Sequence, residues 1–314
     1  LLSLQIAFRG KIFVMAGDTR QIPPVVPFGG EAETSAASLL SSSCYRQNVK
    51  TFHLTKTMRN IGDPAFSKMV DDVGDGIIKP DEEGLIVING VSTVTDVDAA
   101  IDYIFPADIL SDPEACSRRA IVTLHNHTVD DINVSVLDRV FGTTHTLVGV
   151  SLLDHENLEC DYNDAFCMSD HLSTISHNGI PSHTLHLKVN TIVMLVRNLD
   201  VSLNLCNGTK LLVLEISTYT LKVNNMKDGV EHFLPRITFS FITEQGVAVK
   251  RIQFPVRLCF AITVNKSQGQ TLDIVVFDGR LDVFLHGCLY VALSRVRNAA
   301  DIRILTLPSR LTEN

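Results

Sequence analysis

Aromatic residues and long apolar runs are scarce in this sequence. Its 314 residues include no tryptophan, and the aromatic share is 6%. No apolar stretch reaches the roughly 18 residues that a membrane-spanning helix requires, so no membrane partner is expected. The beginning, LLSLQIAFRGK, has no methionine and carries Arg9 and Lys11 within its apolar stretch. We interpret it as a cut into a folded region rather than as a signal peptide.

Paired cysteines are also missing. The seven cysteines are odd in number and scattered, and no two of them form a C-x-x-C pair. The chain is too long for a disulfide-stabilised miniprotein, so an intracellular, reducing compartment is expected.

Positive charge is in short supply and unevenly placed. The formal net charge is −8, which excludes a uniformly basic nucleic-acid coat. Residues 61–160 hold 19 acidic and 5 basic side chains, whereas the rest of the chain holds 16 acidic and 22 basic ones. A polyanion is therefore expected to contact the two ends of the chain and to avoid the middle. The hydrophobic share of 45% suits globular domains with a sizeable core.

Strand-like runs alternate with helical patterns over much of the chain. The runs KIFVMA (residues 11–16) and RRAIVTL (118–124) are typical of buried strands. A helix is expected at 36–47, capped by Thr34 or Ser35, and another at 126–140, with Asn126 available as N-cap. A strand followed by a helix is the repeating unit of a parallel sheet, so an α/β fold is predicted.

The pattern changes near Leu185, where short β-rich runs follow one another. Turn signals separate them, namely CNGT at 206–209, NN at 224–225 and DG at 228–229. This predicts a small antiparallel barrel over residues 187–255, inserted into the α/β part, whose strand–helix alternation resumes after it.

Four short blocks place Arg, Gln, Lys or a hydroxyl where a strand meets a loop or helix. They are GDTRQIPPV (17–25), LTKTMRN (54–60), TVNKSQGQTL (263–272) and YVALSRVRN (290–298). Loop amides and hydroxyls at such junctions can contact phosphate, and arginine can grip it with its planar fork. Each block alone is a weak signal, since it could be an ordinary turn or a solvated helix.

Together and in this order, the four blocks resemble the petite-integration-frequency (Pif-one) type of superfamily-one DNA helicase, and within it the Helitron-associated helicase-like proteins. The resemblance covers nearly the whole chain and includes segments such as AFSKMVDDVGDG and RRAIVTLHNHTVDDIN. It implies a RecA-like motor domain with the inserted barrel and a partial first motor domain. The implied remnant of the first motor domain is residues 1–50. The second motor domain has two parts, residues 51–186 and 256–314, and the barrel between them is residues 187–255.

The resemblance also implies a role for each block. Gln21 would sense the terminal phosphate of ATP, with Asp18 shaping its loop and Pro23 and Pro24 fixing the path. Arg59 would reach the γ-phosphate, and Arg295 would act as the arginine finger. Such a group accelerates phosphoryl transfer about 10³- to 10⁵-fold in related NTPases.

In the third block, Gln268 and Gly269 would lie near the nucleotide, whereas Thr263, Lys266 and Ser267 would face the DNA backbone. The implied function is ATP-dependent unwinding of DNA, 5′ to 3′, with ATP and Mg²⁺ as cofactors. The implied partners are single-stranded DNA and duplex junctions, and contacts to phosphates give salt-dependent binding. The family further implies a nuclear place and roles in DNA repair, recombination and telomere maintenance.

Two parts of an ATP-driven motor are not found in the sequence. A phosphate-cradling loop, G-x-x-x-x-G-K-[ST], is absent, and the only run that resembles a Mg²⁺-organising acidic pair, KPDEEG at 79–84, is more typical of surface. In the family both elements precede the GDTRQ block. We therefore expect a truncated chain that cannot hydrolyse ATP efficiently alone.

Three other interpretations stay open. Zinc could be bound within 155–186, where five of the eleven histidines lie with Cys160 and Cys167, although only His183 and His186 have ligand-like spacing. The histidines are His155, His171, His177, His183 and His186. The triplet HNH at 125–127 could suggest a nuclease, but helix capping by Asn126 is favoured. The chain could also be an inactive transposon-derived fragment with at most weak nucleic-acid binding, which the genomic sequence upstream would distinguish.

Overall fold

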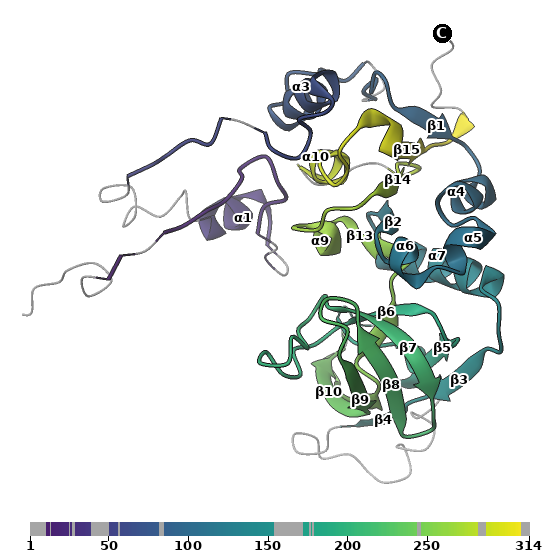
Figure 1. The fold of residues 1–314 in the computed structure, drawn as a ribbon. Helices are drawn as coiled ribbons and strands as arrows, with labels where there is room; N and C mark the ends of the chain where they lie inside the picture. The colour runs from purple at the N-terminus through teal and green to yellow at the C-terminus, as the bar shows by residue number, and fades with distance from the viewer. Residues whose placement is uncertain are drawn as a thin grey trace, which may run out of the picture.

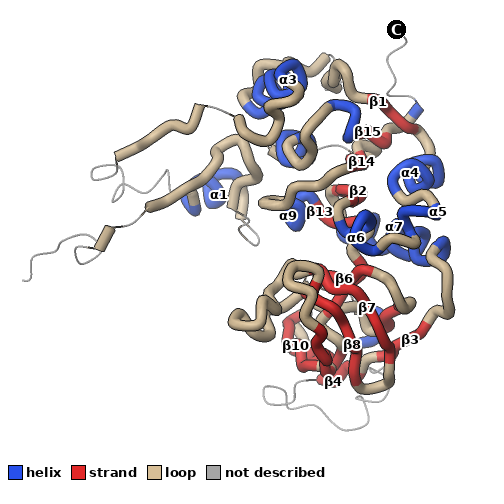
Figure 2. Tube along the Cα trace, in the orientation of Figure 1, coloured by secondary structure: helices blue, strands red, loops and turns tan. Residues whose placement is uncertain are grey.

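The computed structural model describes residues 11–38 except 13, 25, 27 and 28, and residues 50–308 except 56, 82–84, 154–171, 176, 178, 244, 245 and 282–286. Figure 1 shows an upper body of helices around a sheet, a lower body of strands, and extended segments that project from the upper body. Figure 2 shows the same division, with nearly all described helices in the upper body. No helix in this part of the chain has the length and hydrophobicity that crossing a membrane requires.

A five-stranded sheet forms the centre of the upper body. Its order is β1-β15-β14-β2-β13, and all neighbouring strands are parallel, as the sequence predicts. The strands are β1 (Ser92–Val94), β2 (Arg119–Thr123), β13 (Ala261–Thr263), β14 (Ile274–Asp278) and β15 (Ile302–Leu305). Four of the five residues of β2 and of β14 are buried, which is typical of parallel strands covered on both faces.

Helices pack against this sheet and complete the core. They are α3 (Pro64–Gly74), α4 (Val97–Ile104), α5 (Ala107–Leu110), α6 (Pro113–Ser117), α7 (Asn126–Arg139), α9 (Val264–Ser267) and α10 (Cys288–Leu293), with a 3₁₀ turn η4 (Ala299–Asp301). α3 begins after Asp63, whose carboxylate accepts from the amide of Phe66 at 3.0 Å. In α7, Val129, Ile132 and Val136 are buried on one face of the predicted helix.

Antiparallel strands form the lower body. One sheet has the order β12-β6-β7-β8-β9, a second β10-β11-β4, and β3 pairs with β5. The strands are β3 (His145–Val148), β4 (Val150–Leu153), β5 (Thr184–Leu187), β6 (Ile192–Leu195), β7 (Lys210–Ile216), β8 (Thr220–Asn225), β9 (Glu231–Pro235), β10 (Ile237–Ile242), β11 (Ala248–Gln253) and β12 (Val256–Leu258). They enclose a separate apolar cluster that includes Leu211, Val223 and Phe254. β3 and β4 precede the predicted insertion.

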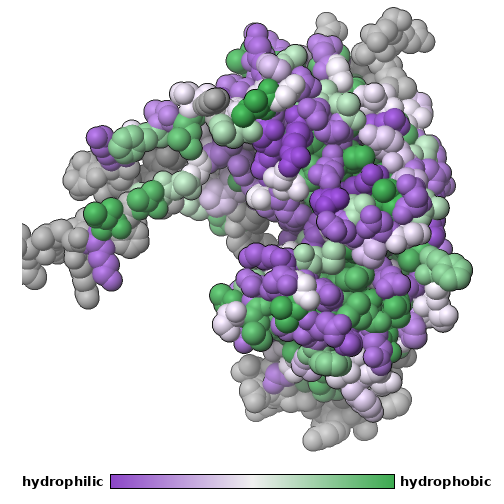
Figure 3. Space-filling model, in the orientation of Figure 1, coloured by the Kyte–Doolittle hydropathy of each residue, from purple (hydrophilic) through white to green (hydrophobic). Residues whose placement is uncertain are grey.

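Local predictions near the N-terminus were wrong. Residues 11–16, where described, form no strand, and Ile12 and Val14 are 95% and 90% exposed. The reason is that no described strand lies beside them to supply hydrogen bonds. Figure 3 shows hydrophobic side chains along the projecting segments, and Leu54 in the second such stretch is 99% exposed.

The first expected helix begins earlier than predicted. Helix α1 is Glu31–Ala37 and begins after Gly30, so neither Thr34 nor Ser35 caps it. Residues 39–47 of the expected helix lie outside the described part.

The cap of α7 also differs from the prediction. His125 is the N-cap of this helix, and Asn126 is its first helical residue. The Asn126 Oδ1 instead accepts from Arg257 Nη1 at 3.2 Å, and so the asparagine is used in tertiary packing.

Candidate functional site

The first block forms a tight turn whose polar groups converge on one carboxylate. Asp18 Oδ2 accepts from the hydroxyl of Tyr290 at 2.8 Å and from the Gln21 amide at 3.3 Å, and its Oδ1 accepts from the backbone amide of Arg20 at 3.1 Å. The Gln21 backbone amide donates to the Asp18 carbonyl at 3.2 Å. Partial burial acts to raise the pKa of Asp18, but these hydrogen bonds and the Arg20 charge outweigh it and lower the pKa.

Tyr290, which lies in α10, is affected in the opposite direction. Burial of its phenol, together with the hydrogen bond to Asp18 and the charge of that carboxylate, raises the pKa of Tyr290 to about 12. The phenol therefore stays a hydrogen-bond donor at neutral pH.

Two glycines let the turn lie directly against the helices. Gly287, the N-cap of α10, has a φ of 82°, and a Cβ there would lie 2.6 Å from the Arg20 carbonyl oxygen and 2.7 Å from the Gln21 carbonyl carbon. At the end of α3, a Cβ on Gly74 would lie 2.8 Å from Arg20 Cδ and 2.7 Å from Tyr290 Cδ2. Larger residues at either position would push the turn away.

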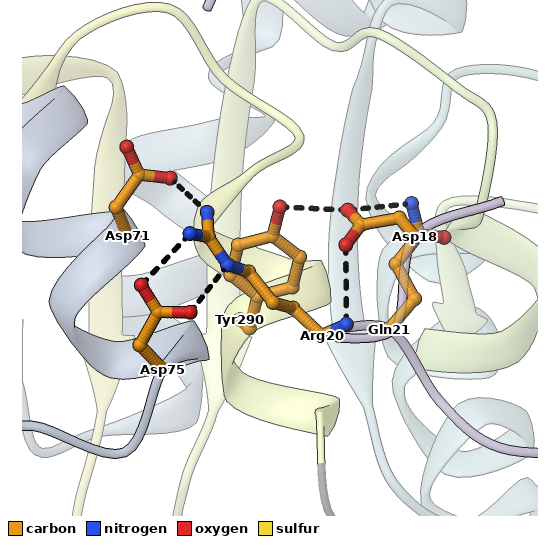
Figure 4. Close-up of polar contacts among 6 residues, drawn as sticks. All are labelled: Asp18, Arg20, Gln21, Asp71, Asp75 and Tyr290. Atoms are coloured by element: carbon orange, nitrogen blue, oxygen red, sulfur yellow. Dashed lines mark hydrogen bonds and ion pairs between the residues drawn. The ribbon is translucent and has the colours of Figure 1, made fainter. Parts of the chain in front are cut away.

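Arg20 fixes the turn to α3 by charge. Its Nε and Nη2 donate to the two carboxylate oxygens of Asp75 at 2.7 and 2.8 Å, and its Nη1 donates to Asp71 at 2.5 Å. Figure 4 shows the guanidinium facing these two carboxylates, while the Tyr290 hydroxyl and the Gln21 amide face Asp18. Burial acts to lower the pKa of Arg20, but the hydrogen bond to Asp75 and the two carboxylate charges raise it.

The second block lies along the segment that follows α10. Arg59 Nη1 donates to the carbonyl of Ser294, and the buried Asn60 donates to the carbonyls of Val296 and Arg297 at 3.1 and 3.0 Å. Burial lowers the pKa of Arg59, and the nearby Arg297 adds to the effect.

Arg295 is held far more tightly than Arg59. It is 2% exposed, and its donors contact the carbonyls of Val291 at 2.8 Å, Ser267 at 3.3 Å and Gln270 at 3.2 Å, and the Ser294 hydroxyl at 2.7 Å. Burial, and then the charge of Arg59, lowers its pKa to about 10. Arg295 thus joins the third block to the fourth in this conformation.

The third block begins at the end of β13, beside the end of the neighbouring β2. Thr263 is the N-cap of α9, Gln268 follows the helix, and Gly269 has a φ of 78° with open space around it. Ser267 corrects a prediction. It was expected to face DNA, but it is completely buried and its hydroxyl donates to the Val264 carbonyl at 2.7 Å, because that hydroxyl satisfies the last turn of α9.

Lys266 connects this block to the antiparallel body. Its ammonium donates to Asn207 Oδ1 at 2.9 Å, and Asn207 lies in the CNGT turn. Burial of the ammonium, and then the charge of Arg257, lowers the pKa of Lys266. Arg257 itself pairs with Asp130 at 2.7 Å. Lys266 and the start of α7 therefore lie on the same side of the sheet, at the carboxyl ends of β13 and β2.

The predicted residues thus fall into two groups. Asp18, Gln21, Arg59 and Arg295 gather around α10 and the turn that follows it, whereas Thr263 and Lys266 lie toward the CNGT turn. Sequence reasoning missed Arg20, Tyr290, Asp71 and Asp75. Tyr290 stood inside a block, and the i, i+4 spacing of Asp71 and Asp75 predicts one helix face, but no pattern pointed to their partners.

The metal alternatives gain no structural support. His183 and His186 bond separately, His183 Nδ1 to Ser151 Oγ at 3.0 Å and His186 Nδ1 to Thr146 Oγ1 at 3.2 Å. Three residues apart along an extended segment, they point to opposite faces. His155, His171, Cys160 and Cys167 lie outside the described residues, as do Glu82 and Glu83 of KPDEEG. Among the residues that are described, no three His, Cys, Asp or Glu side chains are grouped so as to hold a metal ion.

Known proteins show clear similarity to this chain. The family model "PIF1-like helicase" matches residues 3–84, and "DNA helicase Pif1, 2B domain" matches residues 170–216. ATP-dependent DNA helicase PIF1 of Danio rerio is 33% identical over 144 residues, which are 45% of this chain and 22% of that protein. ATP-dependent DNA helicase PIF7 of Trypanosoma brucei brucei is 27% identical over 345 aligned positions, which cover 95% of this chain and 32% of that protein.

A solved structure shows the same fold. The crystal structure of Bacteroides Pif1 bound to single-stranded DNA superposes with a TM-score of 0.59 at 20% identity, over 98% of this chain and 65% of that one. This confirms the predicted α/β, RecA-like fold class. The chain thus matches only about a fifth to a third of the length of the curated relatives named above. Family models, relatives and fold agree with the resemblance carried by the four blocks: in sequence and fold, this chain is similar to the Pif1-like DNA helicases.

Proposed function

We propose that this chain is the C-terminal portion of an ATP-dependent DNA helicase that couples ATP hydrolysis to 5′ to 3′ translocation on single-stranded DNA. One observation supports it above the others. Asp18 accepts a hydrogen bond from Tyr290 of α10, and the Gln21 backbone lies against Gly287 at the start of that helix. The segment that follows α10 carries Arg295 and binds Arg59 through the Ser294 carbonyl. A glutamine amide and two guanidinium groups in one place form a suitable set of donors for the last phosphate of a nucleotide.

The residues present fit one end of an ATP molecule. Gln21, Arg59 and Arg295 would surround the γ-phosphate oxygens, where negative charge must be stabilised during transfer. Bound ATP with Mg²⁺ would supply the phosphoryl group and neutralise part of its charge. This sequence contains neither a phosphate-cradling loop nor an evident acidic pair for Mg²⁺. We therefore expect weak nucleotide binding and negligible turnover by this chain alone.

In this proposal Arg295 must change partners before it can contact phosphate. Four of its five N–H donors are used by protein oxygens. Arg59, with one hydrogen bond to a carbonyl, needs less rearrangement. Arrival of a phosphate would therefore also loosen the link from Arg295 to Ser267 and Gln270, which offers a physical route from nucleotide to the third block.

DNA would follow the surface between the third block and the antiparallel body. Thr263 is the N-cap of α9 and Lys266 lies within that helix, where Asn207 of the CNGT turn accepts its hydrogen bond. The Bacteroides relative is described as bound to single-stranded DNA. We extend that partner, and duplex junctions, to this chain, and place the protein in the nucleus. Ser267 is not part of this surface, since it is buried.

The second candidate is an inactive, transposon-derived fragment that binds nucleic acid weakly or not at all. The missing phosphate loop favours it. The Helitron association, the truncation and the domain boundaries at residues 50, 186 and 255 remain parts of the proposal.

A binding measurement on the full chain separates the two. A fluorescein-labelled 20-nucleotide oligo(dT) strand and a duplex of equal length are titrated at 50 and 200 mM salt, with anisotropy as readout. The helicase portion should prefer the single strand, and Lys266→Ala should weaken binding and reduce the salt slope by about 0.7, the value for one phosphate contact. Lys222→Ala is the matched control, because that lysine pairs with Glu231 on the barrel.

Equal, weak binding by the wild-type chain and both variants would favour the inactive fragment. Turnover of ATP well above background that Arg295→Ala abolishes would contradict the expected inactivity of the chain.

A further inference from the structure

Arg20 belongs to the first block, but the proposed function gives it no part. It is unlike its neighbours Asp18 and Gln21, because its guanidinium faces two carboxylates of α3 (Figure 4). Three hydrogen bonds of its guanidinium go to two carboxylates one helical turn apart, Asp71 and Asp75. Such an arrangement fixes both the position and the orientation of a guanidinium plane.

We propose that Arg20 is a positioning residue, which clamps the first block to α3 through Asp71 and Asp75 and thereby holds the Gln21 side chain near Arg59 and Arg295. The role of Gln21 at the nucleotide rests on the proposed function. The clamp itself exists in the protein without nucleotide and can be tested there.

Shape and charge agree on this clamp. The Arg20 stem passes over Gly74, where a Cβ would lie 2.8 Å from its Cδ, so a larger residue at this position would displace the arginine. On the other side, the Arg20 carbonyl lies against Gly287 of α10. The backbone of residue 20 is thus held between two helices, and Gln21 is the next residue along the chain.

The ion pairs are partly exposed, which sets the size of the effect. The side chains of Arg20, Asp71 and Asp75 retain 32%, 38% and 43% of their accessible surface. Exposed pairs contribute little, whereas a forked arginine–carboxylate contact contributes more. We expect loss of the clamp to speed local opening of the turn by about five- to tenfold.

Amide hydrogen exchange reports that opening directly, because the Gln21 amide is bonded only while the turn is intact. Exchange at Gln21 is measured by nuclear magnetic resonance on the full chain, without nucleotide, at 0.1 and 1 M NaCl. Arg20→Gln and Asp75→Asn should each raise the exchange rate about five- to tenfold at 0.1 M salt. The double variant should exchange no faster than Arg20→Gln alone, since Asp75→Asn removes only a contact that Arg20→Gln has already removed.

The dependence of the exchange rate on salt concentration distinguishes a clamp held by charge from one held by packing alone. The Debye length falls from about 10 Å at 0.1 M salt to about 3 Å at 1 M. The difference between wild type and Arg20→Gln should therefore at least halve at 1 M NaCl. Arg20→Lys keeps the charge but loses the fork, and should fall between them.

The chain offers a closely matched control. Arg139 also bridges two aspartates four residues apart, Asp98 and Asp102 on α4, with distances of 2.5 and 2.8 Å. Arg139→Gln should leave Gln21 exchange unchanged. The clamp would be overturned if Gln21 exchanged in Arg20→Gln at the wild-type rate, or if the effects of the two changes added up in the double variant. It would also be overturned if the difference in exchange rate between wild type and Arg20→Gln were the same at both salt concentrations.

A second measurement tests its consequence. Binding of Mg²⁺–ADP with aluminium fluoride is followed in the presence of oligo(dT), and Arg20→Gln should weaken it about five- to tenfold by the same reasoning. If the wild-type chain does not bind this probe, the proposed function is contradicted while the exchange result still decides the clamp. If Arg20→Gln binds it as tightly as wild type, Arg20 does not position Gln21 for the nucleotide.

Discussion

Replacing Gly287 by alanine tests whether the first block is seated on α10. Gly287 has a φ of 82°, a left-handed conformation that costs an L-residue roughly 1–2 kcal/mol. The added Cβ would also lie 2.6 Å from the Arg20 carbonyl oxygen and 2.7 Å from the Gln21 carbonyl carbon. Backbone atoms cannot rotate away as a flexible side chain can, so the turn must move outward by about 0.5–1 Å to restore van der Waals contact.

Such a shift is large compared with the tolerance of a hydrogen bond. The contact between Tyr290 and Asp18 is 2.8 Å long, and a lengthening of this size would take it beyond about 3.2 Å, where it weakens. Gly287→Ala is therefore expected to release Asp18 from Tyr290 while the parallel sheet stays folded. Its global loss of stability should stay near the roughly 1–2 kcal/mol of the backbone term alone.

Gly229→Ala is the matched control. Gly229 also has a positive φ, of 71°, but nothing lies within 4 Å of the position of its Cβ. It should lose similar stability in urea denaturation and leave the first block in place. Fluorine resonances of 3-fluorotyrosine-labelled protein report the block, with the Tyr290 signal assigned from its absence in Tyr290→Phe. If that signal moves equally in both variants, or in neither, the inferred contact between the block and α10 is refuted.

Two further outcomes follow from buried polar groups. Arg295→Ala leaves the carbonyls of Val291, Ser267 and Gln270 without their donor. The free energy of unfolding should fall by about 3 kcal/mol, because each unpaired acceptor costs about 1–3 kcal/mol and removal of a buried charge offsets part of that cost. The surface change Arg118→Ala should cost under about 0.5 kcal/mol, and equal urea midpoints for the two would contradict this ranking. Asp18 has a pKa lowered below its usual 3.8, so its stabilising contacts are complete above that pH and are lost as pH falls through the lower folded value. Asp18→Asn should therefore speed Gln21 amide exchange at about pH 6 but make progressively less difference below about pH 3.8, and a constant difference between about pH 6 and pH 2.5 would disprove the assignment.

The parallel sheet could be predicted because its signal is local. β2 and β14 each contain a run of consecutive apolar residues, 120–122 and 274–277, and α7 shows Val129, Ile132 and Val136 on one face. The run at 11–16 has equal strand propensity but forms no strand, since a strand also needs a neighbour and none of the described strands lies beside it. Strand propensity therefore predicted a strand correctly only where neighbouring strands lie beside the segment.

The candidate site was likewise predictable only in its local features. The positions of Gln21, Arg59 and Arg295 were accessible from motif order, but their contacts were not. Arg295 was expected to act as an arginine finger, and in this conformation its guanidinium donates to carbonyls of the third block, which satisfy the donors of a buried charge.

The same reasoning explains why Ser267 was misplaced and why Arg20 was overlooked. A short polar residue at the end of α9 can turn inward and bond its own helix, so its letter alone does not fix its direction. Arg20 finds its carboxylates more than fifty residues away, on a helix whose sequence shows only two acidic residues on one face. Interactions between distant segments depend on the assembled fold. In the proposed function, these interactions would link a change at one of the four blocks to a change at another.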